Sequence, residues 1–171
     1  APSEVIAASE VSVDWTGPNH NNDFMAIVPK TAPDGSWKKT AYTRVGSPLK
    51  LVAPSEPGPC EVRYYSGTEN KVLARRDISV KAAVITLAAP ASAPAASSVS
   101  IEWTGPNHTN DYLTIVPQGA QDGATGKLTY TRQGTPIKVV APPAAGPAEI
   151  RYINGGDNRV LARRAITVTA P

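Results

Sequence analysis

Apolar and polar residues alternate along short segments of this chain, and they rarely recur at the spacing of a helix. In residues 11–15, for example, Val11, Val13 and Trp15 take one side of a strand and polar residues take the other. The chain has 17 prolines and 13 glycines, and they interrupt these runs at short intervals. Short alternating segments separated by turn residues predict an all-β sandwich whose strands bury one face.

The first half of the chain contains six such segments. The pattern predicts strands over residues 11–15, 23–28, 37–44, 49–52, 60–64 and 71–80. Lys38 and Lys39 place the third strand at the edge of a sheet, where charged side chains discourage further pairing. The last strand is expected to bend or bulge near Ala74 to Asp77, because it is long and carries two adjacent arginines.

The chain is also a tandem duplication. Residues 1–83 align with residues 89–171 without a gap, and more than half of the aligned pairs are identical. We therefore predict two immunoglobulin-like β-sandwich domains, residues 1–81 and 84–171. The few residues between them form a linker that restricts the range of domain orientations.

The two copies differ at their beginnings. Val84–Leu87 reads as the first strand of the second copy, whereas Ala1 aligns with Ala89, so the first copy has no counterpart of that strand. We expect that the strand lay upstream in a longer chain, since open sheet edges invite unwanted pairing. The alternative is an edge left open in the first domain and partly covered by Val5-Ile6.

Charge and composition exclude several classes of protein. The net charge is +3, from 17 basic and 14 acidic residues, which is too mild to indicate nucleic-acid binding. No run of 18 apolar residues predicts a membrane span. The chain begins at Ala1 without Met, as expected of a processed protein or an excised fragment. Cys60 is the only cysteine and is expected to be a small buried residue, since Ala148 takes its place in the second copy.

The most distinctive shared segment is Trp15-Thr16-Gly17-Pro18-Asn19-His20, followed by Asp23. The same residues recur from Trp103 to His108, followed by Asp111. Both copies also contain the motifs Y-T-R-x-G-x-P, P-x-E-[VI]-R-Y and V-L-A-R-R-x-I-x-V. Together with the Trp-Thr-Gly-Pro-Asn-His segment, these motifs resemble C-terminal repeats of bacterial extracytoplasmic proteins that contain a von Willebrand factor A domain. The resemblance implies an immunoglobulin-like accessory module and a periplasmic or extracellular location.

One departure from that family concerns a corner of the sandwich. The related repeats usually carry Tyr where this chain has Cys60 and Ala148. If that Tyr is a corner residue that hydrogen-bonds the backbone, the two copies here must secure the corner differently. The metal-binding motif of the von Willebrand A domain is absent, so none of its metal chemistry is implied.

The aromatic residues are interpreted mainly as structural. Trp15 and Trp103 end inward-facing strands and are expected to anchor the two cores, with an exposed ligand platform as the alternative. Tyr64 and Tyr152 are expected to face the same cores. Trp37 is replaced by Thr125 in the second copy, so it is a candidate contact residue unless it only packs locally on the surface.

The polar loops carry the other candidate ligand-binding residues: Asn19, His20 and Asp23 in the first copy and Asn107, His108 and Asp111 in the second. Zinc needs three or four N, S or O ligands and calcium needs six to eight oxygens, which one histidine and one carboxylate do not supply. The simpler interpretation is that Asn and Asp fasten the loop backbone, with Asp23 paired to an arginine.

Arg44 and Arg132 complete the list of candidates. With His20, Arg44 could form an anion or glycan site, or the strand arginines could be solvated or paired to carboxylates. No Ser-His-Asp arrangement and no phosphate-binding loop occurs in both copies, so we predict that the chain is not an enzyme and needs no cofactor.

Two functional hypotheses follow from the sequence. The first is a non-catalytic module that spaces, docks or binds a protein partner, or a neighbouring domain of the same chain. The second is a glycan- or calcium-binding module that uses the Asn-His-x-x-Asp loops.

Overall fold

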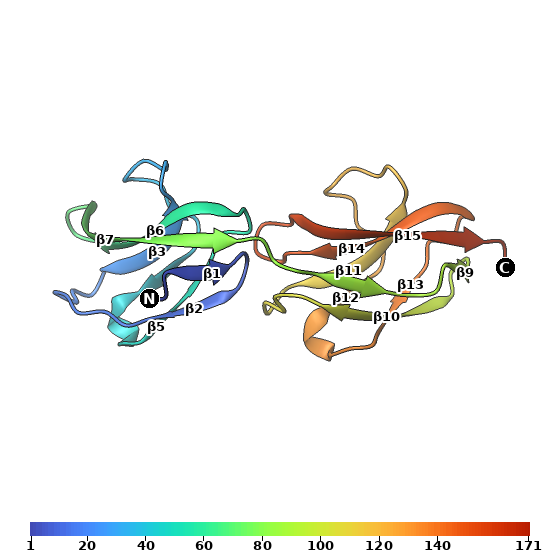
Figure 1. The fold of residues 1–171 in the computed structure, drawn as a ribbon, viewed down its shortest axis with the longest axis horizontal. Coiled ribbons are helices and arrows are strands. Elements are labelled where there is room, and N and C mark those ends of the chain that lie inside the picture. Colours follow the sequence, from blue (N-terminus) through green and yellow to red (C-terminus); the bar gives the residue numbers. More distant parts are fainter. The chain divides into compact units, whose positions relative to one another are not determined.

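The computed structural model describes residues 1–171 and divides into two compact units, Ala1–Ala82 and Ala83–Pro171, called unit 1 and unit 2 below. Each unit is built of strands with one short 3-10 helix (Figure 1). The domain boundaries 1–81 and 84–171 stay a prediction.

Unit 1 contains seven strands and the 3-10 helix η1. They are β1 (Glu4–Ile6), β2 (Glu10–Val13), β3 (Phe24–Pro29), β4 (Thr40–Tyr42), η1 (Thr43–Val45), β5 (Leu49–Val52), β6 (Gly58–Ser66) and β7 (Lys71–Lys81).

Unit 2 repeats this series and adds one strand at its beginning. Its elements are β8 (Thr86–Ala88), β9 (Ser92–Pro94), β10 (Ser98–Thr104), β11 (Tyr112–Pro117), β12 (Leu128–Tyr130), η2 (Thr131–Gln133), β13 (Ile137–Val140), β14 (Gly146–Ile153) and β15 (Val160–Thr169).

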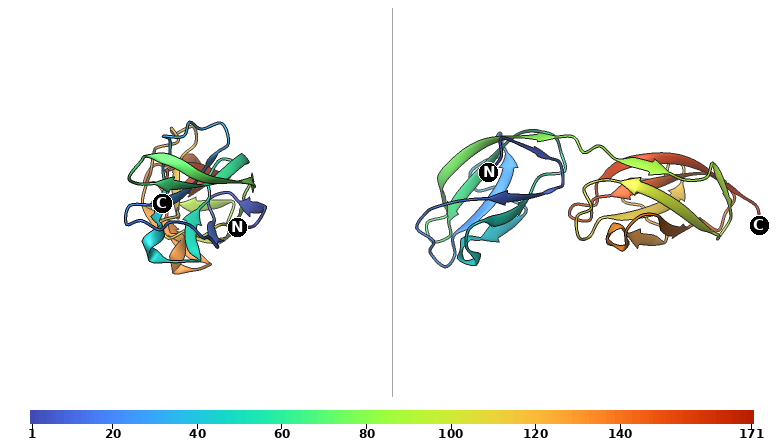
Figure 2. Two further views of the ribbon diagram at one scale, coloured as in Figure 1. Left: turned by 90° about the vertical axis from the view of Figure 1, so that its left-hand side faces the viewer. Right: turned by 60° about the horizontal axis from the view of Figure 1, so that its bottom comes forward.

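Each unit has two sheets that lie face to face, as the right-hand view of Figure 2 shows. In unit 1 the larger sheet has the order β1-β7-β6-β3-β4 and the smaller pairs β2 with β5. In unit 2 the corresponding orders are β9-β15-β14-β11-β12 and β8-β10-β13. Strand β1 pairs in parallel with β7, and β9 pairs in parallel with β15. All other strand pairs are antiparallel. Both units are immunoglobulin-like β-sandwiches.

The core of each unit takes its side chains from both sheets. In unit 1, Val11 and Val13 of β2 pack with Cys60, Val62 and Tyr64 of β6, all of them buried. Their alternation with exposed or opposite-facing residues confirms the predicted orientation of both strands. Unit 2 has the equivalent cluster around β10 and β14.

A second apolar cluster, which was not predicted from the sequence, lies on the outer face of the larger sheet in unit 1. Phe24, Ala26 and Val28 of β3 pack there with the fully buried ring of Tyr65. Strand β3 is therefore buried on both faces. An unbroken apolar run such as residues 24–28 is typical of a strand covered on two sides.

One strand prediction needs correction, and one is located more closely. The strand predicted over residues 37–44 is only Thr40–Tyr42, although its position at the sheet edge is confirmed. The chain leaves the sheet at Thr43, which is buried and bonds the backbone oxygen of Asp23, and Arg44 therefore lies in η1. The predicted bulge lies at Leu73, just before Ala74–Asp77, because Tyr64 pairs with Ala74 while Tyr65 pairs with Val72.

The prediction that Val5-Ile6 covers an open edge of unit 1 was wrong. Strand β1 pairs in parallel with β7 of the other sheet, with Val5 opposite Val80. The smaller sheet of unit 1 consists of β2 and β5 alone, whereas β10 in unit 2 pairs with β8 on one side and β13 on the other. The outer edge of β2 is therefore unpaired within the chain.

None of the helical segments is long or apolar enough to cross a membrane.

Candidate functional site

The Asn-His-x-x-Asp loop of unit 1 is organised around the carboxylate of Asp23, which is fully buried. Its Oδ2 accepts hydrogen bonds from the hydroxyl of Tyr64 at 2.9 Å and from the backbone N–H of His20 at 3.0 Å. Its Oδ1 accepts from the backbone N–H of Gly67 at 3.1 Å. One side chain thus ties its own loop to β6 and to the β6–β7 turn.

Tyr64 is the second centre of this loop. Its hydroxyl oxygen accepts a hydrogen bond from the backbone N–H of Asn19 at 2.9 Å, and its ring lies 5.7 Å from that of Trp15. Asn19 has a φ of 54°, a left-handed conformation that Asn adopts more readily than most residues. A Cβ on Gly17 would lie 2.9 Å from the ring of Tyr64, so the turn can pass this close only with glycine.

Unit 2 repeats this arrangement with its own residues. The Oδ2 atom of Asp111 accepts from Tyr152 at 2.9 Å and from the backbone N–H of His108 at 3.0 Å. Asn154 donates an additional bond from Nδ2 to Asp111 Oδ1 at 3.1 Å, where unit 1 has Ser66. The shared segment therefore performs the same structural task in both units.

Each tryptophan joins its polar loop to the glycine that follows the 3-10 helix of the same unit. Trp15 donates its indole N–H to the carbonyl of Gly46 at 3.0 Å, and Trp103 donates to Gly134 at 2.9 Å. Trp103 is 7% exposed, whereas Trp15 is only half-buried although it packs against the core of unit 1.

Burial and hydrogen bonding shift the pKa of Asp23 in opposite directions. Burial disfavours the ionised form of Asp23, but the bonds from Tyr64, Gly67 and His20 outweigh it and hold the carboxyl pKa below its ordinary value. Burial raises the pKa of the Tyr64 hydroxyl, and the bond to Asp23 adds to this effect. The loop is therefore built for an ionised Asp23 and a neutral Tyr64.

The predicted pairing of Asp23 with an arginine was wrong, because a tyrosine and two backbone amides supply its donors. Arg44 instead donates to the carbonyl of Asn21 at 3.1 Å, and its guanidinium lies 4.3 Å from the ring centre of Tyr42.

Arg132 repeats both features in unit 2. It donates to the carbonyl of Thr109 at 3.5 Å, and its guanidinium lies 4.5 Å from the ring centre of Tyr130. Each arginine therefore lies beside its polar loop and donates a hydrogen bond to a backbone carbonyl of that loop.

The two histidines are placed differently. The side chain of His20 is 69% exposed, and its Nδ1 lies 3.7 Å from Asp23 Oδ2. His108 is half-buried, and its Nδ1 is buried without a hydrogen-bond partner. Nowhere do three His, Cys, Asp or Glu side chains gather as metal ligands would. Asn19 and Asn107 are exposed beside the histidines.

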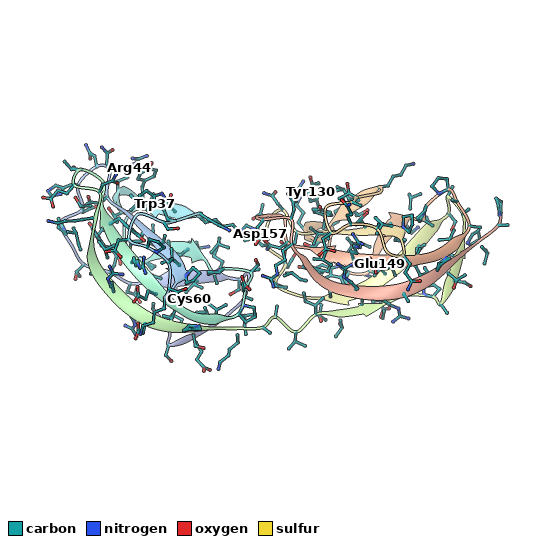
Figure 3. All side chains as sticks on the ribbon, turned by 90° about the horizontal axis from the view of Figure 1, so that it is seen from above. Trp37, Arg44, Cys60, Tyr130, Glu149 and Asp157 are labelled. Carbon is teal, nitrogen blue, oxygen red and sulfur yellow. The ribbon has the colours of Figure 1, made fainter.

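Trp37 belongs to the outer apolar cluster rather than to the polar loop. Its ring lies 5.0 Å from Phe24 and 5.1 Å from Tyr65, and it is half-buried. Figure 3 labels it on unit 1 together with Arg44. Its role in ligand binding, like that of the loop residues, stays a prediction.

An ion network on the larger sheet was not identified as a site by sequence. Arg63 is 1% exposed, donates from Nε to Glu61 at 2.7 Å and bonds the carbonyls of Ala32 and Pro33. Arg75 joins Glu61 at 3.0 Å. The hydrogen bond from Arg63 lowers the pKa of Glu61 despite its burial. The Glu-x-Arg motif, which occurs in both copies, was the sequence signal that could have identified this network. In unit 2 the same network is formed by Glu149 (Figure 3), Arg151 and Arg163.

No protein-family model matches the chain, and no curated protein matches it in sequence. Among solved structures it is similar to domains 3 and 4 of rat CD4, with 14% identity over 96% of this chain and 97% of that one and a TM-score of 0.33. It is also similar to adhesin InvE of Yersinia pseudotuberculosis, with 14% identity, 99% and 57% coverage and a TM-score of 0.32. An amphioxus IgVJ-C2 molecule matches at 13% identity, 97% and 99% coverage and a TM-score of 0.31.

Proposed function

We propose that this chain is a non-catalytic tandem β-sandwich module that spaces, docks or binds a protein partner as part of a larger bacterial extracytoplasmic protein. The observation that carries the proposal is the placement of the polar loop residues. The carboxylates of Asp23 and Asp111 point inward and accept bonds from loop amides and a tyrosine, so they fasten the fold.

The exposed apolar side chains support a protein partner. Tyr42, Val45 and Leu73 of unit 1 and Val84 and Leu128 of unit 2 are each at least 40% exposed. Contact with a partner would remove these side chains from water, which is favourable by roughly 25 cal/mol per Å² of apolar area. The periplasmic or extracellular location rests on the resemblance of the W-T-G-P-N words to repeats of extracytoplasmic proteins that contain a von Willebrand factor A domain.

Photo-crosslinking in cells that produce the native polypeptide tests this proposal. A photoreactive phenylalanine derivative is placed singly at Tyr42, Val45, Val84 or Leu128, and at exposed Lys50 as a polar control. We expect a covalent adduct with one defined protein from at least one apolar position and none from Lys50.

The opposite result would support the alternative function. If no position gives an adduct while calorimetry with calcium or a glycan panel gives saturable heat that His20→Ala abolishes, the chain is a ligand-binding module and the proposal is wrong.

A further inference from the structure

The two units differ on the outer face of their larger sheets, where Trp37 of unit 1 corresponds to Thr125 of unit 2. The indole of Trp37 lies 5.0 Å from the ring of Phe24 and 5.1 Å from that of Tyr65. These two rings stack on each other at 4.8 Å. Because threonine has no ring, unit 2 lacks the group that covers this face in unit 1.

A cavity of about 620 Å³ lies at this place in unit 2, and we call it the ring pocket. The residues that line it include Tyr112 of β11, Leu128 and Tyr130 of β12, Thr125 before β12, Asn110 before β11 and Asn158 before β15. Thr125 and Ile153 are both smaller than their aromatic counterparts, so unit 2 has less side-chain volume on this face. Ligand pockets in proteins typically measure roughly 300–1,000 Å³.

The aromatic wall of the ring pocket matches the wall against which Trp37 packs in unit 1. The rings of Tyr112 and Tyr130 (Figure 3) lie edge to face with their centres 6.3 Å apart. Their counterparts Phe24 and Tyr42 lie edge to face at 6.4 Å, and the indole of Trp37 packs on Phe24. Unit 2 thus has the pair of rings that holds an indole in unit 1, without an indole of its own.

The loop that carries Thr125 is fixed to the sheet beside the ring pocket. The hydroxyl of Thr114 accepts a hydrogen bond from the backbone N–H of Gly126 at 3.0 Å and donates to the carbonyl of Lys127 at 3.2 Å. A Cβ on Gly126 would lie 2.7 Å from the carbonyl oxygen of Ile115, so the loop approaches β11 this closely only with glycine. The pocket is therefore preformed, and a ligand needs to order little of it on binding.

The lining of the ring pocket favours a neutral ligand. Asp122 is its charged residue, and the carboxylate is already paired with the guanidinium of Arg163. Asn110 and Asn158 are exposed and offer neutral side-chain amides. An uncharged aromatic group suits this surface better than an ion does, and an amide oxygen can accept the N–H of an indole.

We propose that the ring pocket binds a tryptophan side chain of a protein partner, the group that Trp37 supplies to the equivalent face of unit 1. The inference rests on the proposed function and names the group by which the partner docks. Tryptophan is among the residues most enriched at the energetic centres of protein interfaces, where it fills a pocket. Leu128 lines the ring pocket and is 40% exposed, so the pocket adjoins an apolar position already assigned to partner contact.

A second copy of this chain is a poor source of the tryptophan. The chain has three tryptophans, and all of them are engaged within their own units. Trp15 and Trp103 donate their indole N–H groups to backbone carbonyls, and Trp37 packs against two rings. Each would have to leave these contacts to enter another molecule. A tryptophan exposed on a different protein has no such contacts to lose.

The test uses the full chain, labelled with ¹⁵N, and N-acetyltryptophanamide, a neutral molecule that carries the indole. We expect saturable amide shifts around Tyr112, Thr125 and Tyr130 at millimolar concentrations, and none around Phe24 and Trp37, where the site is filled. N-acetylalaninamide has the same backbone groups and should cause no shifts. Absence of saturable shifts in unit 2, or equal shifts from both amides, would overturn the proposal.

Chain variants sharpen the result. Thr125→Trp gives unit 2 the indole that unit 1 has at this position and should abolish binding of the tryptophan amide, whereas Thr125→Ser should not. Leu128→Asp places a charge in the apolar wall and should weaken binding about tenfold or more. Val45→Asp, at an aliphatic residue 78% exposed and outside the ring pocket, should leave binding unchanged. Amide spectra of the free variants establish that each is folded. Equal binding by Thr125→Trp and Thr125→Ser would contradict the proposal.

Two other occupants would be recognised by the same measurements. Shifts of the pocket residues with a methyl hexoside, but not with the tryptophan amide, would identify a glycan site and overturn the proposal. Self-association in light scattering that Thr125→Trp abolishes would show that a second copy fills the pocket, which also overturns it.

The inference and the proposed function can fail separately. A chain that crosslinks a partner in cells but does not bind the tryptophan amide keeps the proposed function and overturns the ring pocket as the docking site. A chain that binds the amide in the pocket but crosslinks no partner from any position keeps the aromatic specificity of the pocket and overturns the proposed function.

Discussion

At the scale of single residues, Tyr64 explains why the segment Trp15–His20 is so distinctive. Trp15 packs on its ring, Gly17 lets the backbone pass close to it, and Asn19 donates to its hydroxyl. Asp23 accepts from that hydroxyl. A segment that looks like a binding loop in sequence is held together by a buried tyrosine and a buried carboxylate.

Replacing Tyr64 by Phe removes the hydroxyl that joins Asn19 and Asp23. We expect a loss of about 1–3 kcal/mol in the free energy of unfolding, because a buried carboxylate and a backbone amide each lose a partner. Urea unfolding of the full chain measures it. Tyr42→Phe is the matched control, since that residue is 44% exposed, and a similar loss there would contradict the assignment.

Because Asp23 can be protonated, its contact with Tyr64 predicts that the stability of the chain depends on pH. The pKa of Asp23 is lowered in the folded chain, so its ionised form contributes stability above the unfolded pKa of about 3.9. That contribution is lost as the pH falls through the folded pKa. The stability gap between the natural chain and Asp23→Asn should therefore shrink below about pH 4, as urea midpoints at several pH values would show. A constant gap from neutral to acidic pH would contradict this account.

At the scale of elements, the same carboxylate ties the β6–β7 turn to the loop before β3. Gly67 donates to Asp23 Oδ1, and a Cβ on it would lie 1.9 Å from the carbonyl oxygen of Asn22. The approach is possible only because residue 67 lacks a side chain.

Gly67→Ala should therefore force the turn away from the loop and cost about 1–3 kcal/mol, as overpacking usually does. Gly35→Ala is the control, because nothing lies within 4 Å of a Cβ there. Its effect should be small. Thermal unfolding of both variants measures the difference. Equal melting temperatures for the two variants would show that the close approach at Gly67 does not affect stability.

The sequence predicts elements best where alternation is clean. The strands of Val11 and Val13 and of Cys60, Val62 and Tyr64 follow the pattern because one face is core and the other is not. The strand over 37–44 was predicted too long, since a buried threonine starts a 3-10 turn that hydrophobic spacing does not encode.

Long-range contacts account for the rest of the missed features. Nothing local shows that Asp23 meets a tyrosine 41 residues away rather than an arginine. Arg63 is buried by a network that gathers carbonyls and a carboxylate from distant segments. Sequence pattern does identify the residues of the candidate loops, but their direction, inward for Asp23 and outward for His20, depends on the packed fold.

At the scale of the whole molecule, duplication makes the two units near copies, and strand β8 of unit 2 has no counterpart among residues 1–82. Every side chain that the extra strand covers in unit 2 has an identical counterpart in unit 1: Trp15, Leu73, Ala74 and Arg76 for Trp103, Leu161, Ala162 and Arg164. The first set is more exposed than the second, although the residues are identical.

The central claim is that Tyr64 and Asp23 fasten the segment Trp15–His20 to the fold. Hydrogen–deuterium exchange of the free chain, resolved by NMR, tests it most directly. We predict that the amides of Asn19, His20 and Gly67, which donate to Tyr64 or Asp23, are protected. Rapid exchange of these three amides would contradict the account.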